Sequence, residues 1–267
     1  MKIPEPALLR EIIAVLNSGA VEDAELEAKW ILEDVDSPEQ ALQIAQYRAK
    51  REPLQYLLGK WEFYGLTMFV GAGVLIPRAD TETLVDAVLS RVKDSSSQMI
   101  ADLCTGSGCI ALALASQMDH TQFAGLDLST KALEYAEKNL AYHQFANVKF
   151  VCADVLDEAA AAQYQGLAAI VCNPPYLTAE DMRNLQAEVR FEPETALYGS
   201  PAGLHFYREI TRIWKPSLCS GGLLAYEVGA GQADDVAAIL SQNGFAEIEK
   251  IRDLNGVERV IVAKNRL

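Results

Sequence analysis

The chain has 267 residues, of which 50% are hydrophobic and 22% are charged, enough for one large or two modest domains with buried cores. Its 37 acidic residues against 23 basic ones give a formal net charge of -14, which disfavours a broad DNA-binding surface. Five cysteines without a CxxC pair and three scattered histidines predict neither a disulfide framework nor a metal site. Because the sequence shows neither a signal-peptide core nor a long apolar run, we expect a cytoplasmic protein without a membrane segment.

The N-terminal part follows a helical pattern. From residue 6 to about residue 50, apolar residues keep the spacing of amphipathic helices and predict a small bundle. Ser37-Pro38-Glu39-Gln40 is typical of a helix start, with a capping serine, a proline in the first turn and a glutamine that can close a capping box. Aromatic and β-branched residues broken by glycines at 65, 71 and 73 then predict a strand pair. We expect a helical domain over 1–60, a β-hairpin linker over 61–78 and a larger domain over 79–267.

Short apolar runs alternate with helical stretches from residue 99 onward, at 99–103, 123–128, 148–154, 168–173 and 222–228. This alternation predicts right-handed βαβ units and a parallel sheet that is buried on both faces. Two further runs, 248–253 and 258–264, flank Asn255-Gly256, which is a strong hairpin signal. The fold class is therefore α/β: a Rossmann-like, mostly parallel seven-stranded sheet with a C-terminal antiparallel hairpin, the order expected of class I methyltransferases.

The segment 101–115 runs from a strand through a turn of small residues, Thr105-Gly106-Ser107-Gly108, into a helix. Glycines in such a turn bring backbone N–H groups close to a ligand. Asp127 closes the next strand, where a carboxylate can accept both hydroxyl groups of a ribose. Together these residues predict an adenosine pocket.

The turn does not read GxGxxG, as a dinucleotide site would, and an acidic residue, Asp102, precedes it. This favours a cofactor without phosphates, and S-adenosylmethionine fits because its cationic amino acid end tolerates carboxylates. Cys104 has no flanking histidine or basic residue, so we expect it and the other four cysteines to be packing residues.

Asn173-Pro174-Pro175-Tyr176 follows the fourth parallel run and therefore lies on the ligand-binding edge of the sheet. The Asn173 side-chain oxygen and the Pro174 carbonyl can each accept one hydrogen from a planar NH₂ group, while the Tyr176 ring covers its face. Two such acceptors would turn this poor nucleophile toward a sulfonium methyl group and favour the charge that grows on nitrogen. These four residues are the candidate catalytic residues, and no general base is obvious in the sequence.

Further segments that carry a family pattern lie at 51–65, 73–86, 102–112, 188–210, 221–232 and 253–264. With the tetrapeptide at 173–176, they make the chain resemble the HemK/PrmC family, the peptide chain release factor N5-glutamine methyltransferases. The resemblance implies an S-adenosylmethionine-dependent transferase of translation termination that releases S-adenosylhomocysteine. Its acceptor would be the glutamine amide (N5) in the Gly-Gly-Gln loop of class I release factors, which the helical N-terminal domain would grip. We expect a monomer without nucleic-acid or membrane partners.

Position by position, the resemblance implies cofactor contacts at Cys104, Thr105, Gly106, Ser107, Gly108, Asp127, Asp154, Val155 and Asn173. Cys104 replaces a glycine of the family, and Val155 stands where an aromatic can occur, so stacking on adenine would be weaker. Arg78 is expected to line the cleft, where it could pair with a cofactor or substrate carboxylate. A structural salt bridge explains it at least as well, and it is not a catalytic candidate. Five carboxylates and two arginines between residues 176 and 200 predict an acidic, mostly solvated lip.

Other functions stay open at this point. A ribosomal-protein glutamine methyltransferase would have a nearly identical pocket. An adenine N6-methyltransferase would use the same clamp but needs phosphate-binding groups, of which the acidic region 150–200 has few. A nucleotide-binding module or dehydrogenase without methyl transfer is disfavoured because GxGxxG is absent.

Overall fold

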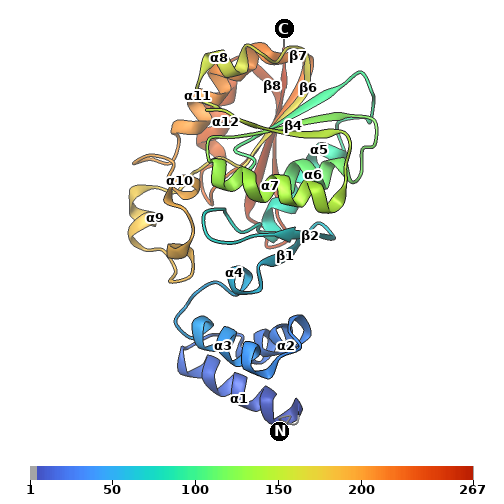
Figure 1. Ribbon diagram of the computed structural model, residues 1–267. Coiled ribbons are helices and arrows are strands. Elements are labelled where there is room, and N and C mark those ends of the chain that lie inside the picture. Colours follow the sequence, from blue (N-terminus) through green and yellow to red (C-terminus); the bar gives the residue numbers. More distant parts are fainter. Residues whose placement is uncertain (1–4, 267) are drawn as a thin grey trace.

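The computed structural model describes residues 5–266. The outer limits of the predicted domains, at residues 1 and 267, fall outside this range. Three helices come first, and Figure 1 shows them as a bundle that stands apart from the sheet: α1 (Glu5–Ser18), α2 (Ala24–Asp34) and α3 (Pro38–Arg48). Their inward faces form a separate apolar core that includes Ile12, Leu16 and Ile31. The predicted helical bundle is confirmed.

Helix α3 begins at the predicted proline. The Ser37 side chain accepts a hydrogen bond from the Gln40 backbone N–H and so caps the helix. The Ser37 hydroxyl itself donates to the Glu39 carboxylate at 2.9 Å. The expected capping box is not closed among the described residues, because the helix start has the Ser37 cap but no return hydrogen bond from the Gln40 side chain to the Ser37 backbone N–H.

The predicted strand pair is also present, between the bundle and the sheet (Figure 1). A short helix, α4 (Leu54–Leu58), leads into β1 (Lys60–Phe63), which pairs antiparallel with β2 (Leu66–Phe69). Tyr64 and Gly65, the two turn residues, have φ of 52° and 71°. Two successive positive φ values are the signature of a tight hairpin turn, which explains the glycine. The functional limits of the three predicted domains remain a prediction.

The large sheet has the predicted seven strands. In spatial order they are β5 (Val148–Cys152), β4 (Gln122–Asp127), β3 (Met99–Leu103), β6 (Leu167–Cys172), β7 (Leu218–Glu227), β9 (Glu258–Asn265) and β8 (Phe245–Arg252). The first five are mutually parallel, and β9 is antiparallel to both of its neighbours. This is the mostly parallel sheet with a C-terminal hairpin that the sequence predicts.

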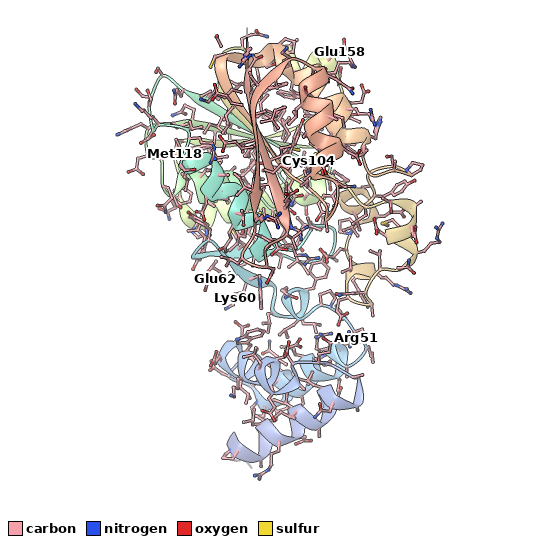
Figure 2. The ribbon with its side chains drawn as sticks, turned by 180° about the vertical axis from the view of Figure 1, so that it is seen from behind. Arg51, Lys60, Glu62, Cys104, Met118 and Glu158 are labelled. Carbon is pink, nitrogen blue, oxygen red and sulfur yellow. The ribbon has the colours of Figure 1, made fainter. Side chains whose placement is uncertain are left out.

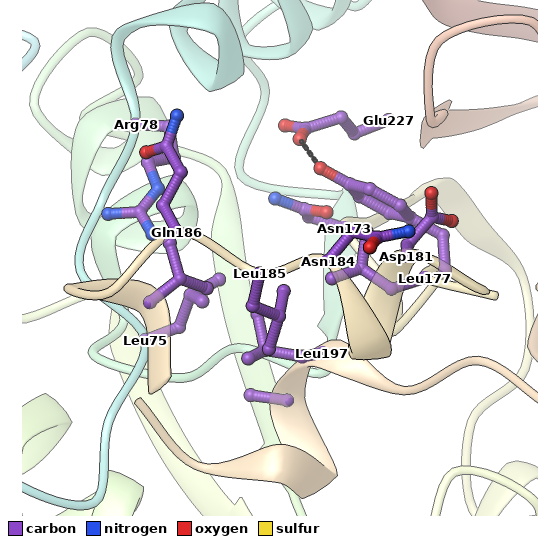
Figure 3. Close-up of a pocket in the computed structure, with 13 residues that line it drawn as sticks. Leu75, Arg78, Asn173, Leu177, Asp181, Asn184, Leu185, Gln186, Leu197 and Glu227 are labelled. Atoms are coloured by element: carbon purple, nitrogen blue, oxygen red, sulfur yellow. Dashed lines mark hydrogen bonds between the residues drawn. The ribbon is translucent and has the colours of Figure 1, made fainter. Parts of the chain in front are cut away.

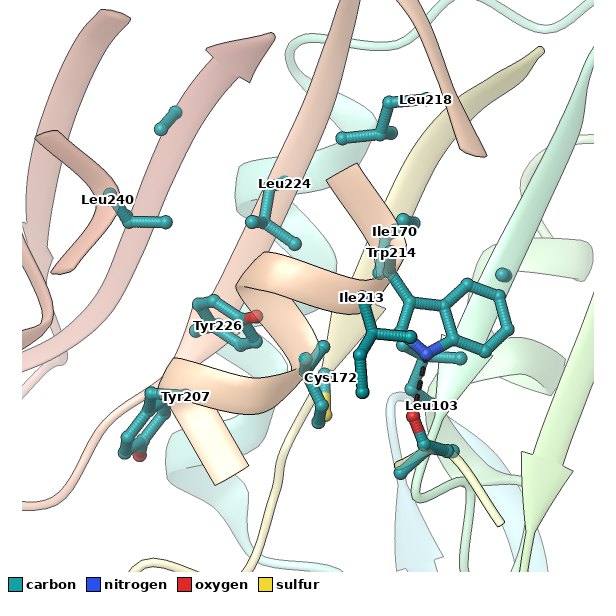
Figure 4. Close-up of a cluster of buried hydrophobic side chains, with 14 of the residues drawn as sticks. Leu103, Ile170, Cys172, Tyr207, Ile213, Trp214, Leu218, Leu224, Tyr226 and Leu240 are labelled. Carbon is teal, nitrogen blue, oxygen red and sulfur yellow. Dashed lines mark hydrogen bonds between the residues drawn. The ribbon is translucent and has the colours of Figure 1, made fainter. Parts of the chain in front are cut away.

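Helices cover both faces of the sheet because successive side chains of its strands point in opposite directions. Ile170 and Cys172 pack in one apolar cluster with α8 (Glu158–Ala161), α11 (His205–Trp214) and α12 (Ala233–Gln242), part of which Figure 4 shows. Ala169 and Val171 belong to the opposite cluster, with residues of α5 (Glu82–Leu89), α6 (Cys109–Ala115) and α7 (Thr130–His143). Both faces of the sheet are therefore buried under helices.

The remaining elements are short. Helices α9 (Ala179–Arg183) and α10 (Glu194–Leu197) lie in the segment between β6 and α11, which projects beside the sheet in Figure 1. Single 3₁₀ turns occur at η1 (Ala79–Thr81), η2 (Val189–Phe191) and η3 (Lys215–Ser217). Among the described residues, no helix combines the length and the hydropathy that a bilayer crossing requires.

All five cysteines are free. Cys109 and Cys172 are buried, and Cys104 and Cys219 are partly buried, as expected for packing residues. Cys152 is exposed, so the expectation of a packing role was wrong for this one residue. It ends β5 at the rim of the sheet, where the strand leaves the core.

Candidate active site

The carboxyl ends of β4, β3, β6 and β7 meet at one edge of the sheet, because these neighbouring strands are parallel. Strands β3 and β6 are followed at this edge by predicted site residues, and β4 and β7 end in the carboxylates Asp127 and Glu227. Ligands of open α/β sheets bind at this edge. The site is built from these four strand ends.

The turn after β3 is held by its own strand neighbours. Cys104 has φ of 58°, and Gly106 and Gly108 have φ of 58° and 79°. Cys104 thus occupies a left-handed position that favours glycine. This explains why a glycine is common here in the family that the sequence resembles. A Cβ on Gly108 would lie 2.5 Å from the Phe150 ring, whereas a Cβ on Gly106 would meet no atom within 4 Å. The first glycine leaves open space beside the turn, and the second allows close packing.

Asp102 braces this turn from inside. Its side chain is buried, and Oδ2 accepts hydrogen bonds from the Thr105 hydroxyl at 2.5 Å and from the Ala111 backbone N–H at 3.2 Å. Burial raises the pKa of Asp102 to about 7, although both hydrogen bonds oppose this. The other carboxylate oxygen, Oδ1, is buried and has no hydrogen-bond partner among the described residues. A carboxylate oxygen without a hydrogen-bond partner favours a cationic group beside it.

Asp127 ends β4 directly beside the turn. Its carboxylate accepts hydrogen bonds from the backbone N–H groups of Gly106 and Ser129, both at 2.8 Å. Burial raises its pKa, against the effect of these backbone donors. Each oxygen of a carboxylate has a second lone pair, so Asp127 can still accept hydroxyl groups while it holds the turn.

Asp154 and Val155, which the resemblance places beside the adenine, differ in exposure. Asp154 is exposed in the loop after β5, where its carboxylate accepts from the Leu156 N–H at 2.8 Å. Val155 is 5% exposed, packs in the core, and its carbonyl accepts from the Trp214 indole at 2.8 Å. A contact from Val155 to a ligand would therefore come from its backbone and not from its side chain.

Asn173 and Tyr176 follow β6 and line one cavity of about 330 Å³, together with Glu227 at the end of β7. Pro174 and Pro175 between them are buried. Figure 3 shows the Asn173 amide and the Glu227 carboxylate on one side of this cavity, with Arg78 and Gln186 on the other.

The Tyr176 hydroxyl lies 3.4 Å from Glu227 Oε1, and the Gln232 side chain donates to the Tyr176 carbonyl at 3.0 Å. Close packing adds to this restraint, because a Cβ on Gly203 would lie 2.3 Å from that same carbonyl oxygen. The backbone that carries the aromatic ring is thus held on two sides.

Glu227 is 2% exposed, and its Oε2 accepts the hydroxyl proton of Thr81 at 2.6 Å. Burial raises the pKa of Glu227 to about 7, while Thr81, Arg259 and Tyr176 lower it. A carboxylate that titrates near neutrality inside a cavity is typical of functional sites.

The cavity is therefore lined by an aromatic ring, a carboxamide and a buried carboxylate. Of these groups, the carboxamide can orient a planar amide group through a hydrogen bond, and the ring can pack against its face. Among residues 5–266, no group of three or more histidine, cysteine, aspartate or glutamate side chains is placed to hold a metal ion.

Comparison with known proteins decides the family. A family model described as "Methyltransferase small domain" matches residues 78–192. The release factor glutamine methyltransferase of Thermodesulfovibrio yellowstonii is 41% identical over 222 residues, which cover 82% of this chain and 78% of that protein. The protein of the same name from Geobacter sulfurreducens is 37% identical over 281 residues, 97% of both chains. The chain belongs to the release factor glutamine methyltransferase family.

Solved structures agree on the architecture. A methyltransferase from Pyrococcus furiosus superposes with a TM-score of 0.58 at 13% identity, and the match covers 77% of this chain and 91% of that one. At this identity the likeness concerns the fold alone. It supports the Rossmann-like fold that the strand order indicates.

In this methyltransferase, Arg78 forms a structural salt bridge, which is one of the two interpretations of this residue. Its guanidinium pairs with the buried Glu192 carboxylate, which also accepts from the Ile76 N–H at 2.9 Å. Arg78 lines the cavity as expected, but its charge is compensated from within the chain.

The acidic lip follows the expectation in part, since three of its five carboxylates, Glu180, Asp181 and Glu194, are exposed. Glu188 pairs with Arg48 at 2.8 Å and Arg51 at 2.7 Å, and Glu192 pairs with Arg78, so two of its carboxylates are neutralised by arginines from outside the segment. Figure 2 shows Arg51 at the junction of the bundle with the rest of the molecule. The sequence-based count considered only charges within the segment, which is why it overestimated the negative charge.

Sequence reasoning missed three residues of this site: Thr81, Glu227 and Gln232. All three lie in segments that carry the family resemblance, but no role was assigned to them. The usable signal was Glu227, a carboxylate at the end of a buried apolar run. Thr81 gave no such signal, because only the tertiary contact with Glu227 distinguishes it from other buried threonines.

Proposed function

We propose that this chain transfers a methyl group from S-adenosylmethionine to the N5 amide nitrogen of the glutamine in the Gly-Gly-Gln loop of class I release factors. The observation that carries this proposal is that Asn173, Tyr176 and Glu227 line one cavity at the strand edge where the turn after β3 also ends. The relatives are named release factor glutamine methyltransferases, which supports the choice of substrate.

The residues at the turn fit this donor. S-adenosylmethionine would supply an electrophilic methyl group on a sulfonium sulfur. The unpartnered Oδ1 of Asp102 suits the donor's positively charged amino acid end, and the Asp127 carboxylate can accept ribose hydroxyl groups. The open space beside Gly106 leaves room for ligand atoms against the backbone. We assign the cofactor role to this turn and to Asp127, with backbone contacts from residues 104–108.

The cavity residues would act on the nucleophile. The Asn173 carboxamide oxygen and the Pro174 carbonyl would each accept one N–H of the glutamine amide, and the Tyr176 ring would cover its face. Holding both hydrogens directs the nitrogen toward the methyl carbon and stabilises the positive charge that develops on it. Formation of the new N–C bond would break the S–C bond and release S-adenosylhomocysteine, and the alkylated nitrogen would lose one of its protons to solvent.

The shape of the cavity suits a glycine-rich loop. Its wall contains several apolar side chains, including Leu75, Leu185 and Leu197, beside the polar ones. A loop with two glycines before its glutamine has no side chains that would collide with this wall. An extruded adenine would instead need cationic groups around the entrance, and the arginine at the cavity, Arg78, is paired with Glu192.

The test is to incubate the protein with methyl-labelled S-adenosylmethionine and one of three acceptors: a purified release factor, the same factor with alanine in place of the loop glutamine, or a ribosomal protein fraction. We expect label on the intact factor alone. Label on the alanine variant would contradict the amide assignment. Label only on a ribosomal protein would replace the release factor as substrate while leaving the chemistry in place.

A further inference from the structure

We infer that Thr81 and Glu227 form a positioning pair that sets the direction of the Asn173 carboxamide. The inference rests on the proposed function, because it explains how the clamp of that reaction is oriented. The two residues come from η1 and the end of β7, and their side chains are each 2% exposed. Neither is expected to touch the substrate amide directly.

The first step concerns the hydroxyl proton of Thr81. Thr81 Oγ1 lies 2.6 Å from Glu227 Oε2. An ionised carboxylate can only accept hydrogen bonds, so the single hydroxyl proton must point toward Glu227. Thr81 therefore presents lone pairs in every other direction.

The second step concerns Asn173. Its Nδ2 lies 3.4 Å from Thr81 Oγ1, at the long end of hydrogen-bonding distance. The flipped amide would bring Oδ1 against the Thr81 oxygen, so that two acceptors would face each other without a proton between them. The Thr81 lone pair thus selects the orientation in which Nδ2 points back and Oδ1 remains for the incoming amide.

The same carboxylate also reaches the aromatic part of the clamp. Glu227 Oε1 lies 3.4 Å from the Tyr176 hydroxyl, while the Tyr207 hydroxyl donates to the Glu227 backbone carbonyl at 2.9 Å. Glu227 is therefore fixed by its own backbone and orients one residue through each carboxylate oxygen. Contacts of this kind are often long before substrate binds and shorten in the complex.

A purely structural role explains these residues less well. The Thr81 side chain does not cap the helix that follows it, although threonine often does. A carboxylate buried beside hydroxyl groups costs folding free energy that a neutral side chain of the same shape would not. This loss of folding free energy is explained if the ionised carboxylate is needed to direct the Thr81 proton.

The test compares Thr81→Val, which keeps the shape but lacks the hydroxyl, with Thr81→Ser, which keeps the hydroxyl. We expect Thr81→Val to lower kcat by about 10- to 100-fold, since a misdirected clamp loses alignment. KM for the release factor and the affinity for S-adenosylmethionine should stay within about twofold of wild type, and Thr81→Ser should restore kcat. Wild-type kcat in Thr81→Val would overturn the inference.

A double-mutant cycle separates positioning from packing. On an Asn173→Ala background the Thr81→Val change should cost no further activity, because the group it orients is absent. Additive losses would show that Thr81 acts independently of Asn173 and would also overturn the inference. If Thr81→Val fails to fold by circular dichroism, Glu227→Gln replaces it, with the same fall in kcat expected because its amide can donate to Thr81.

Failure of the proposed function looks different. If the wild-type protein transfers no label to the release factor, the proposed reaction is wrong and the positioning role falls with it. If the wild type is active and Thr81→Val matches its kcat, the positioning pair alone is wrong.

Discussion

The proposed clamp centres on Asn173, whose side chain lines the cavity and lies 3.4 Å from the Thr81 hydroxyl oxygen. An acceptor that acts on a charge growing in the transition state changes kcat more than substrate binding. A substitution of Asn173 should therefore lower kcat without changing the affinity for S-adenosylmethionine.

We predict that Asn173→Ala lowers kcat by roughly 100-fold or more, by analogy with the loss of a single oxyanion-hole group. Affinity for S-adenosylmethionine, measured by calorimetry, should be unchanged, because the turn after β3 is intact. Asn255→Ala, an exposed asparagine in the β8–β9 turn, is the control and should match wild type. Methylation at the wild-type rate by Asn173→Ala would show that the clamp is assigned wrongly.

The protonation state of Glu227 should make the orientation of the proposed clamp depend on pH. The charged and titratable groups around its side chain come from η1, β9 and the loop after β6: Asp80, Arg259 and Tyr176. Burial is the largest influence and raises the pKa of Glu227 to about 7, so a proton is retained well above the usual range of a glutamate. Below that pH the carboxyl group carries its own proton and no longer fixes the direction of the Thr81 hydroxyl.

The expected result is an acid limb in the pH profile. With a raised pKa, the active, ionised form is lost as the pH falls through about 7, and kcat should decline there. Glu227→Gln should have a lower kcat that no longer varies in this range. Measuring kcat with the release factor from about pH 5.5 to about pH 8.5 tests both statements. An acid limb of the same shape in Glu227→Gln would assign the titration to another group.

At the scale of the element, the turn between β3 and α6 uses its two glycines for different purposes. Gly106 and Gly108 both have positive φ, but only Gly108 is enclosed by neighbouring side chains. Gly166, before β6, has φ of 68° and, like Gly106, open space around a Cβ. An alanine at Gly166 should therefore cost as much backbone strain as one at Gly106, but at the opposite end of the parallel strands.

We predict that Gly106→Ala and Gly166→Ala destabilise the protein to a similar degree, by about 1 kcal/mol, because both place a Cβ at positive φ. Only Gly106→Ala should also weaken S-adenosylmethionine binding, by about tenfold or more, since its methyl group enters the space assigned to the ligand. Urea unfolding and calorimetry measure the two effects. Equal ligand affinity in the two variants would remove the cofactor from this turn.

For the whole molecule, the contact between the helical bundle and the lip of the site is electrostatic. Arg48 is held by Glu27 at 2.7 Å and by Glu188 at 2.8 Å, with only 8% of its side chain exposed. Glu188 follows residues 184–186, which line the cavity. The bundle proposed to grip the substrate is therefore tied directly to the segment that borders the reaction site.

We predict that Glu188→Ala lowers the free energy of unfolding by roughly 1 to 3 kcal/mol, because two charge-assisted contacts at a shielded site are lost. KM for the release factor should rise as the lip loosens, with S-adenosylmethionine affinity unchanged. The control is Glu158→Ala, whose partner Arg212 has 54% of its side chain exposed, and which should change stability by less than about 0.5 kcal/mol. Equal stability of the two variants would mean that the junction is not held by this pair.

The elements themselves could be predicted because their signals are local. The run 99–103 coincides with β3, and the helix after Ser37 begins where the capping serine and proline place it. The tetrapeptide 173–176 also reached the strand edge, since parallel strands bring their carboxyl ends together. Apolar periodicity and turn chemistry act over a few residues, so neither depends on the rest of the chain.

The sequence by itself determined the order of helices and strands, the edge of the sheet where the candidate site lies, and the two motifs at that edge. Only the tertiary structure decided which partners those motifs have. Thr81 meets Glu227 across 146 positions of the chain, and Arg48 meets Glu188 across 140. Such pairs depend on the register of the strands and on how the bundle docks, and these are set by burial of the whole core, which no local pattern encodes.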